Sequence, residues 1–440
     1  MHQPRRRRHT GWWLLLAAAL VAACVAWALI RPIMWRPALA PQKAIPSFDG
    51  VRIARGANLA RLGMCASCHT ADPARPFAGG KPMQTPLGTI HSTNITPHPA
   101  TGIGGWSPDA FTRAMREGVS RDGHLLYPAF PYNHYVRMTQ QDIDDLYAYF
   151  MTRPPLEAPA RENDMTFPFG LRPLVGFWNV LYLDDAPWRP DPRQSAEWNR
   201  GAYLADAVAH CAACHTPRTL LQGPDLAHSL DGGDAEGWYA PALNAKSPSP
   251  LPWTRAQLQH YLRTGIAQDH AVAAGPMQDV VVHLAQADEA DVAALAAWTH
   301  SHLARAPARA TPARREGPLP APDADDPDLQ RMRLGHELYL NSCARCHDPG
   351  RAPGSGTALP LQKAIALYDP DPRSLLRIVD EGILPPEGEP ARWMPGFGAI
   401  LTDRQAVALA AYLRKYGAGQ PAWPGLEDAV HAARTPEKAP

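Results

Sequence analysis

The sequence has almost no net charge. Its 43 Lys and Arg residues nearly balance 42 Asp and Glu residues over 440 positions, which leaves a formal charge of +1. Proteins that bind nucleic acid or a strongly anionic partner usually carry a clear positive excess. The composition therefore gives no argument for such a partner, and we expect no nucleic acid.

The motifs of several enzyme classes are also missing. There is no glycine-rich dinucleotide fingerprint, no Walker loop and no visible pairing of a nucleophile with a base. No strand-rich region stands out in the sequence either. These absences predict that the chain is not an enzyme by itself, and they favour an all-α fold.

Cysteine is scarce, but its placement is regular. Six of the seven cysteines form three copies of one pattern, and Cys24 stands apart. The copies are Cys65-Ala66-Ser67-Cys68-His69, Cys211-Ala212-Ala213-Cys214-His215 and Cys343-Ala344-Arg345-Cys346-His347. An odd count in a strict pattern argues against a disulfide framework and for a bound cofactor.

Cys-x-x-Cys-His is the attachment signature of c-type haem. Helix positions i, i+3 and i+4 share one face, so two thiols can form thioethers with one haem while the histidine lies under its iron. We therefore predict three haem c groups, with His69, His215 and His347 as axial ligands. A redox dithiol needs no adjacent histidine, and a zinc site would pair two such motifs at short separation.

Methionine is the usual second axial ligand in cytochromes c. Met277 and Met394 are the only methionines that follow the second and third motifs within their domains, each in a loop before an apolar helix, expected over 290–299 and 404–414. In the first domain Met138, just before an expected helix over 141–151, is the best candidate. Its alternatives stay open, namely an iron without a sixth ligand or one of Met83, Met115, His98, His124 and His134.

The N-terminus predicts a membrane anchor over residues 1–36. Four arginines, Arg5 to Arg8, precede an uncharged apolar run over about 11–30, and about 20 such residues can span a bilayer as a helix. Because arginines mark the cytoplasmic side, we expect the rest of the chain on the periplasmic side of the inner membrane. A cleaved signal peptide, or a lipoprotein site at Cys24, are the alternatives.

Each motif is preceded by a short helical pattern in which a glycine is followed by apolar residues, and this internal repeat marks three homologous domains. The expected fold is three tandem cytochrome c domains at 48–155, 195–305 and 327–417, with a proline-rich linker at 306–326 and a tail at 418–440. An aromatic stretch with Phe167, Phe169, Phe177 and Trp178 follows the first domain. We expect it to pack between domains, with contact to a partner as the alternative.

The chain resembles the three-haem cytochrome c subunit of membrane-bound bacterial dehydrogenases, such as alcohol, gluconate and aldehyde dehydrogenases. The resemblance rests on Thr85-Pro86-Leu87-Gly88-Thr89-Ile90 and Ser92-Thr93-Asn94-Ile95-Thr96-Pro97 in the first domain, Gly237-Trp238-Tyr239-Ala240-Pro241 in the second and Met394-Pro395-Gly396-Phe397-Gly398 in the third. Phe130 replaces a methionine that many relatives have.

The resemblance implies an electron-transfer subunit. Its partner would be a quinoprotein, flavoprotein or molybdoprotein dehydrogenase, with a small third subunit in some complexes and ubiquinone or another respiratory acceptor in the membrane. Two competing hypotheses stay open. One is a free-standing membrane cytochrome that links quinol oxidation to a terminal oxidase, and the other is a self-contained haem enzyme.

Overall fold

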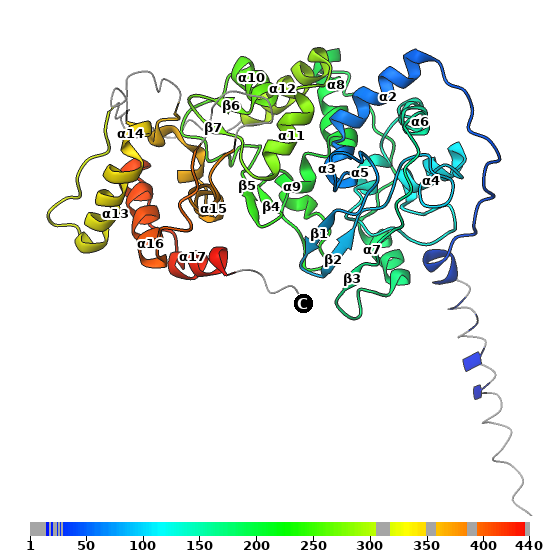
Figure 1. The fold of residues 1–440 in the computed structure, drawn as a ribbon, viewed down its shortest axis with the longest axis horizontal. Coiled ribbons are helices and arrows are strands. Elements are labelled where there is room, and N and C mark those ends of the chain that lie inside the picture. The colour runs from blue at the N-terminus through cyan, green and yellow to red at the C-terminus, as the bar shows by residue number, and fades with distance from the viewer. Residues whose placement is uncertain are drawn as a thin grey trace, which may run out of the picture.

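The computed structural model describes residues 30–304, 317–348, 358–384 and 394–435, together with six positions at 15, 16, 19, 20, 24 and 27. The three predicted domains follow one another along the molecule. Helices of the first two domains, blue to green in Figure 1, lie side by side, and those of the third, yellow to red, form one end. The predicted domain boundaries stay predictions.

One helix pair is repeated three times. The helix before each motif packs against a later helix that closes the domain. The pairs are α2 (Gly50–Leu62) with α6 (Gln140–Met151), α8 (Ala196–Tyr203) with α12 (Glu289–Leu303), and α13 (Leu329–Ser342) with α16 (Asp403–Tyr412). The internal repeat that the sequence suggests is therefore present as a repeated packing unit.

A glycine lies at the crossing point of each pair. A Cβ atom added to Gly56, Gly201 or Gly335 would approach a carbonyl oxygen of the closing helix to 2.0, 2.0 and 2.2 Å, respectively. In each domain the residue four positions after that carbonyl is a large aromatic residue that also touches the glycine, namely Tyr149, Trp298 and Tyr412. Only glycine lets the backbones approach this closely.

Short polar caps start several of these helices. The Thr139 hydroxyl accepts a hydrogen bond from the Asp142 N–H at the start of α6. Thr402 and Gln405 form a capping box at the start of α16. Such caps satisfy N–H groups that have no partner within the helix.

The remaining helices lie between a motif and its closing helix or follow a closing helix. They are α4 (Pro108–Glu117), α5 (Tyr132–Tyr135), α7 (Val175–Tyr182), α10 (Arg255–Thr264), α11 (Pro276–Leu284), α15 (Arg373–Glu381) and α17 (Leu426–Arg434). The motifs themselves form α3 (Cys65–His69), α9 (Ala212–His215) and α14 (Ala344–His347). A π-helical turn, Leu204–Val208, extends α8, and a second one, Leu413–Gly417, extends α16.

The all-α expectation was wrong in one respect, because the loops contain short antiparallel strands. β1 (Pro82–Thr85), β2 (Gly88–His91) and β3 (Asp164–Met165) form one sheet in that order. Two strand pairs follow, β4 (Gly233–Ala235) with β5 (Trp238–Ala240), and β6 (Ile266–Ala267) with β7 (Ala271–Val272). Strands of two to four residues are too short to show the alternation by which strands are recognised in a sequence.

The first two domains share one hydrophobic core, whereas the third has its own. The shared cluster joins residues such as Leu62 and Leu146 to Leu204 and Leu295. The cluster of the third domain includes Tyr339, Leu376 and Tyr412. Residues 317–326, at the end of the predicted linker, pack on this third core, where Leu319 is buried.

The first two domains contact each other reciprocally. In the first domain the Asn58 side chain donates to the Asp291 carboxylate at 2.8 Å and accepts from the Asp288 N–H at 2.9 Å, at the start of α12. In the second domain the Tyr203 hydroxyl accepts from the Thr139 N–H at 3.1 Å and donates to Asp142, at the start of α6. Asn58 and Tyr203 each lie two residues after their crossing glycine. The two domains are thus joined through equivalent positions.

The predicted membrane anchor is the second error. Among the described parts of the chain, no helix is long and apolar enough to cross a bilayer. Most of the run predicted as a spanning helix, over 11–30, lies outside the described residues.

Candidate functional site: three histidine-bearing cysteine motifs

Each Cys-x-x-Cys-His motif forms one helical turn directly after the first helix of its pair. In the first two domains the residue before the first cysteine adopts a left-handed conformation, with φ of 52° at Met64 and 41° at His210. This residue turns the chain between the long helix and the motif. Both cysteines lie on the short helix in the first motif, whereas Cys211 and Cys343 are the N-cap residues of the helices in the other two.

The three histidines have the same backbone contact. Nδ1 lies 2.6 Å from the Thr93 carbonyl in His69, 2.7 Å from the Pro241 carbonyl in His215 and 2.8 Å from the Leu359 carbonyl in His347. A carbonyl can only accept, so Nδ1 carries the proton and Nε2 keeps its lone pair. A second partner that fixes the tautomer in this way is typical of histidines that bind a metal.

Glycines bring the accepting carbonyls close to the first two motifs. A Cβ on Gly79 would lie 2.4 Å from the Thr93 carbonyl carbon, so only glycine fits there. In the second domain, a Cβ on Gly233, at the start of β4, would lie 2.5 Å from the Cys214 carbonyl oxygen. The β4–β5 hairpin leads directly into Pro241. In the first two domains, the stretches that carry the family resemblance therefore hold the acceptors of His69 and His215.

Met394 is clamped by its backbone to the end of α15. It exchanges two hydrogen bonds with Ile383, at 2.9 and 3.0 Å. A Cβ on Gly382 would lie 2.3 Å from the Met394 carbonyl oxygen. The following Phe397 donates its N–H to the Val379 carbonyl at 2.8 Å. The loop is thus held in place without using the methionine side chain.

Met277 lies in the first turn of α11, rather than in the loop that the sequence suggested. Gly275, two residues earlier, packs on the Trp238 ring, which a Cβ at that position would approach to 2.4 Å. This contact ties the start of α11 to β5, the strand that precedes the acceptor for His215. Met277 therefore lies on a helix whose start packs against the strand that precedes the carbonyl acceptor of His215.

Met138 is buried in the shared core, with 2% of its surface exposed. Its carbonyl accepts from Arg116 at 2.8 Å, just before α6. Three histidines that are alternatives to Met138 use Nδ1 elsewhere. His98 accepts from the Thr101 N–H, His124 pairs with Asp122, and His134 contacts the Asp206 carbonyl. The assignment of Met138 stays a prediction.

The ionisation of the motif cysteines also helps to distinguish a redox dithiol from a site of haem attachment. Burial raises the pKa of Cys65, Cys211 and Cys343 to about 12. A reactive dithiol needs a lowered thiol pKa, so these pairs do not resemble a redox dithiol. None of the seven cysteines, all of them described, forms a disulfide. In the described ranges no group of three or more Cys, His, Asp or Glu residues is placed so that it could hold a metal ion.

The histidines are neutral near pH 7. Burial lowers the pKa of His69, His215 and His347, although each hydrogen bond to a carbonyl opposes this shift. Neutral imidazole is the form that ligates a metal. Two thiols and one oriented, neutral imidazole per motif are the set that covalent haem attachment requires.

Comparison with known proteins decides the family. The chain is 35% identical to the fructose dehydrogenase cytochrome subunit of Gluconobacter japonicus, over 82% of this chain and 78% of that protein. It is 36% identical to the gluconate 2-dehydrogenase cytochrome c subunit of Pantoea cypripedii, over 82% and 85%. The chain belongs to the family of dehydrogenase cytochrome c subunits.

Two further matches differ in extent. The chain is 43% identical over 90% of its length to one subunit of the nicotinate dehydrogenase of Pseudomonas putida, but it spans only a third of that protein. The family model described as cytochrome c oxidase, cbb3-type, subunit III matches residues 330–413, in the third domain. The function of the cytochrome subunit is therefore electron transfer through haem c, as the resemblance implied, and it is not a catalytic enzyme by itself.

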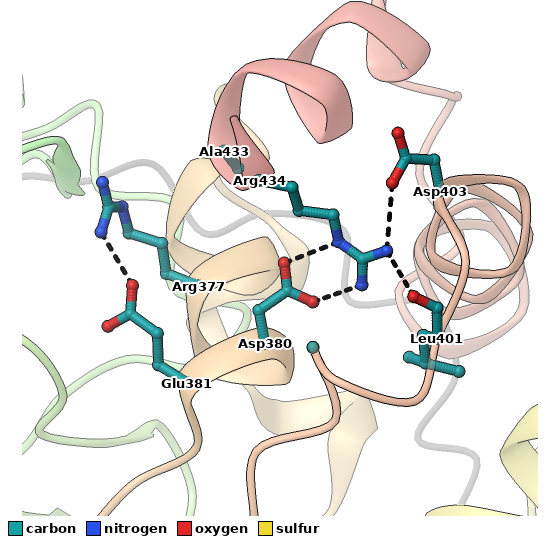
Figure 2. Close-up of a pocket in the computed structure, with 8 residues that line it drawn as sticks. Arg377, Asp380, Glu381, Leu401, Asp403, Ala433 and Arg434 are labelled. Carbon is teal, nitrogen blue, oxygen red and sulfur yellow. Dashed lines mark hydrogen bonds and ion pairs between the residues drawn. The ribbon is translucent and has the colours of Figure 1, made fainter. Parts of the chain in front are cut away.

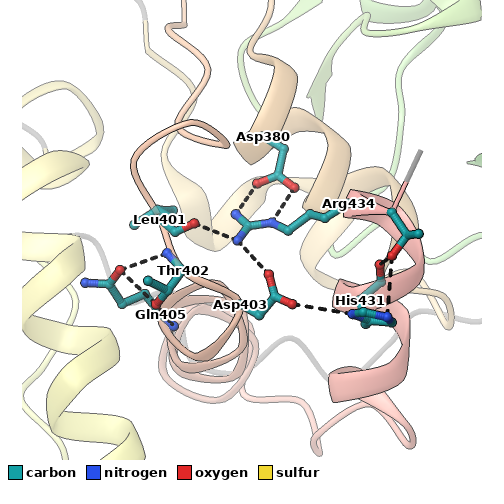
Figure 3. A network of polar contacts seen from close by, with 8 residues as sticks. Asp380, Leu401, Thr402, Asp403, Gln405, His431 and Arg434 are labelled. Atoms are coloured by element: carbon teal, nitrogen blue, oxygen red, sulfur yellow. Dashed lines mark hydrogen bonds and ion pairs between the residues drawn. The ribbon is translucent and has the colours of Figure 1, made fainter.

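The tail of the cytochrome subunit supports the Met394 loop, which sequence reasoning did not foresee. Arg434 of α17 binds the Asp380 carboxylate through two hydrogen bonds of 2.6 and 2.9 Å (Figure 2). It also donates to the Leu401 carbonyl at 2.7 Å and reaches Asp403, which His431 approaches from α17 (Figure 3). The buried residues Trp423, Leu426 and Val430, at near-helical spacing, were the available signal.

A surface pocket of about 420 Å³ lies beside this network (Figure 2). The charged groups that line it are paired with one another. Arg377 binds Glu381 at 2.8 Å, and Arg434 binds Asp380 and Asp403. These ion pairs join α15, α16 and α17, and we assign no ligand to the pocket.

Proposed function

We propose that the chain carries three haem c groups and relays electrons from a catalytic dehydrogenase subunit to ubiquinone or another respiratory acceptor. The observation that supports three groups is a unit repeated three times. Each unit has a crossing glycine, a Cys-x-x-Cys-His turn and a histidine whose Nδ1 donates to a backbone carbonyl. Haem, when bound, supplies iron that cycles between two oxidation states.

In this proposal the side chains of the protein attach the haem groups, orient them and shield them. Cys65, Cys68 and their counterparts would hold the cofactor covalently, and each carbonyl-bound histidine would ligate the iron through Nε2. Met277 and Met394 are the proposed distal ligands, from the start of α11 and the loop before α16, and Met138 is proposed for the first domain. Cys65 and Cys211 pack against the shared core, and Cys343 packs against the third core.

The packing of the domains suits a relay. The residue before Met64 is Gly63, and a Cβ there would lie 3.4 Å from the Val208 carbonyl of the second domain. Ser67 of the first motif reaches His283 of α11 at 3.4 Å. The third domain joins the second through Ser374, which exchanges hydrogen bonds with the Tyr239 backbone at 2.8 and 3.1 Å. Each motif is thus linked to the next through packed protein.

A dehydrogenase of the quinoprotein, flavoprotein or molybdoprotein type is the proposed electron donor, with a small third subunit in the same complex. The 43% identity to a nicotinate dehydrogenase subunit favours a nicotinate dehydrogenase among these. We further propose that the chain is exported, with its haem domains on the periplasmic side of the inner membrane. The arginines at 5–8 before an apolar run are typical of exported chains.

Counting haem tests the proposal directly. Haem assayed as its pyridine complex should give three groups per purified chain, all resistant to acidified organic solvent. Cys214→Ala should weaken or abolish covalent attachment at the second motif and leave two, whereas Cys24→Ala, which changes the cysteine outside the motifs, should leave three. Fewer than three groups in the unaltered chain would contradict the proposal, and a high-spin haem that binds carbon monoxide would favour the haem enzyme instead.

A further inference from the structure

The second and third domains meet at the β4–β5 hairpin. The helix α15 of the third domain contacts β5, and the two elements lie side by side in Figure 1. β5 ends at Ala240, and the next residue, Pro241, provides the carbonyl that accepts from Nδ1 of His215 at 2.7 Å. A helix of the third domain therefore packs against the strand that leads to the histidine partner in the second domain.

Ser374 of α15 satisfies the open edge of β5. Its hydroxyl accepts from the Tyr239 N–H at 3.1 Å and donates to the Tyr239 carbonyl at 2.8 Å. An edge strand presents N–H and carbonyl groups that no neighbouring strand pairs, and such groups need a partner when they are buried. Ser374 itself is buried, with 7% of its surface exposed. One hydroxyl of the third domain thus holds the backbone two residues before Pro241.

Two arginines of α15 hold the same hairpin on either side of Ser374. Arg377 donates through Nε to the Gly237 carbonyl at 3.0 Å, and Arg373 pairs with Asp234 on β4. A Cβ on Gly237 would lie 2.7 Å from the Arg377 guanidinium, so the turn of the hairpin lies directly against that side chain. Residues three and four apart share one face of a helix. This face of α15 is therefore fitted to the hairpin from its first turn to its second.

The same helix carries the loop of the proposed ligand in the third domain. Ile383, two residues after the end of α15, exchanges two backbone hydrogen bonds with Met394. The helix has nine residues, so it is only about 14 Å long at 1.5 Å per residue. One short helix thus holds the strand before the His215 acceptor at its start and the Met394 loop at its end.

We propose that Ser374 is a positioning residue through which the third domain sets the reduction potential of the second haem. The inference rests on the proposed function, because it requires haem at the second motif. A hydrogen bond from Nδ1 to a carbonyl makes a ligating histidine more basic, which favours the oxidised iron. Loss of the Ser374 hydroxyl leaves the Tyr239 N–H and carbonyl without this partner. The Pro241 carbonyl is then held less firmly against His215, and the potential of the second haem rises.

Ser374→Ala tests this role in the full, haem-loaded chain by a spectroscopic redox titration. At a fixed applied potential, the ratio of reduced to oxidised haem should rise about threefold or more in one centre, which is about 30 mV for a one-electron couple. The shifted centre should be the one that is absent from Cys214→Ala, and the other two should keep their potentials. Three unchanged potentials would overturn the proposal, and so would a shift confined to a centre that Cys214→Ala retains.

Ser249→Ala is the matched control. The Ser249 hydroxyl lies 3.1 Å from Nδ1 of His270, and the His270 carbonyl accepts from the Ile365 N–H of the third domain at 2.9 Å. The control therefore loses the same oxygen atom near another contact of these two domains, outside the β4–β5 hairpin. It should leave the potential of the second haem unchanged. An equal shift in both variants would reflect a general loosening between the domains and would overturn the specific role of Ser374.

A second variant covers the case in which Ser374→Ala loses its haems. Arg377→Lys keeps the charge of the side chain but lacks the guanidinium Nε that donates to the Gly237 carbonyl. Because both residues hold the same hairpin, the second centre should shift in the same direction. In that case, an unshifted second centre would overturn the proposal.

The two proposals fail separately, because the haem content is measured on the same samples as the potentials. An unaltered chain that lacks haem at the second motif would overturn the three-haem relay, and the role of Ser374 with it. Three attached haems together with an unshifted second potential in Ser374→Ala would overturn only the role of Ser374.

Discussion

Met394 is the residue whose role the structure supports through its surroundings. Its loop is held to α15 by backbone hydrogen bonds with Ile383, and Arg434 braces α15 from the tail. The side chain is therefore not needed to hold the loop. Met394→Ala should keep covalent haem and lower the potential of one centre by about 100 mV or more, part of the ~0.8 V range that axial ligands span. A spectroscopic redox titration measures this.

Met332→Ala is the matched control for that variant. Met332 is the other methionine of the third domain, 5% exposed in its core. Its loss should reduce the free energy of unfolding by about 2–5 kcal/mol and leave all three potentials unchanged. Three unaltered potentials in Met394→Ala would show that this methionine is not a ligand.

Residue types alone indicated much of the site. The Cys and His residues follow from their spacing, and Met394 follows because it is the only methionine after the third motif. The carbonyls of Thr93, Pro241 and Leu359 could not be predicted, because every residue has a carbonyl and only the fold selects one. Met277 was expected in a loop, but it lies in the first turn of α11, where proline such as Pro276 is favoured.

At the scale of elements, the crossing of the two helices in each pair depends on one glycine. Gly56→Ala would bring a methyl group to 2.0 Å from the Asp145 carbonyl oxygen, so α2 and α6 must move apart. We expect a loss of about 2 kcal/mol or more in the free energy of unfolding, measured by urea denaturation. Gly50→Ala is the control in the same helix, since a Cβ there meets nothing within 4 Å.

The free energy of unfolding of the control variant should lie within about 1 kcal/mol of that of the unaltered chain. We expect the difference to favour the variant. If both substitutions had the same effect, close packing at the crossing would not be the reason for the glycine. Equivalent results at Gly201 and Gly335 would extend the rule to all three domains.

Elements were predictable where the apolar period was long enough. The closing helices α6, α12 and α16 were expected near their observed bounds, and a helix was expected before each motif. The hairpin β4–β5 was not, because three-residue strands carry no period. The opposite error arose at the N-terminus, where hydropathy alone predicted a spanning helix that the described residues do not support.

At the scale of the whole molecule, two histidines lie in the junction of the first two domains, His134 buried and His210 half-buried. The rings of His134 and His210 are 6.1 Å apart, and Tyr135 packs edge-on against His210. His134 contacts the Asp206 carbonyl at 2.9 Å, and Arg137 pairs with the Asp206 carboxylate. Sequence reasoning weighed His134 only as a ligand, because the contact between domains cannot be read from either segment alone.

This junction should make the association of the two domains sensitive to acid. Burial, and then the charge of His134, lower the pKa of His210 to about 4. The pKa of His134 is also lowered by burial, although Asp206 opposes the shift. Because the pKa is lower in the folded chain, the unfolded chain takes up protons at a higher pH than the folded chain does. Stability is therefore complete above the ordinary histidine pKa of about 6.5 and is lost as the pH falls toward 4.

The expected loss from His210 alone between pH 7 and pH 5 is about 2 kcal/mol in the free energy of unfolding. Urea denaturation of the haem-loaded chain at the two pH values measures it. His210→Asn is the variant to compare, because asparagine tolerates the left-handed backbone at this position and does not titrate. If the variant lost as much stability as the unaltered chain over this range, the histidine pair would not couple the junction to pH, and other groups would have to account for the acid sensitivity.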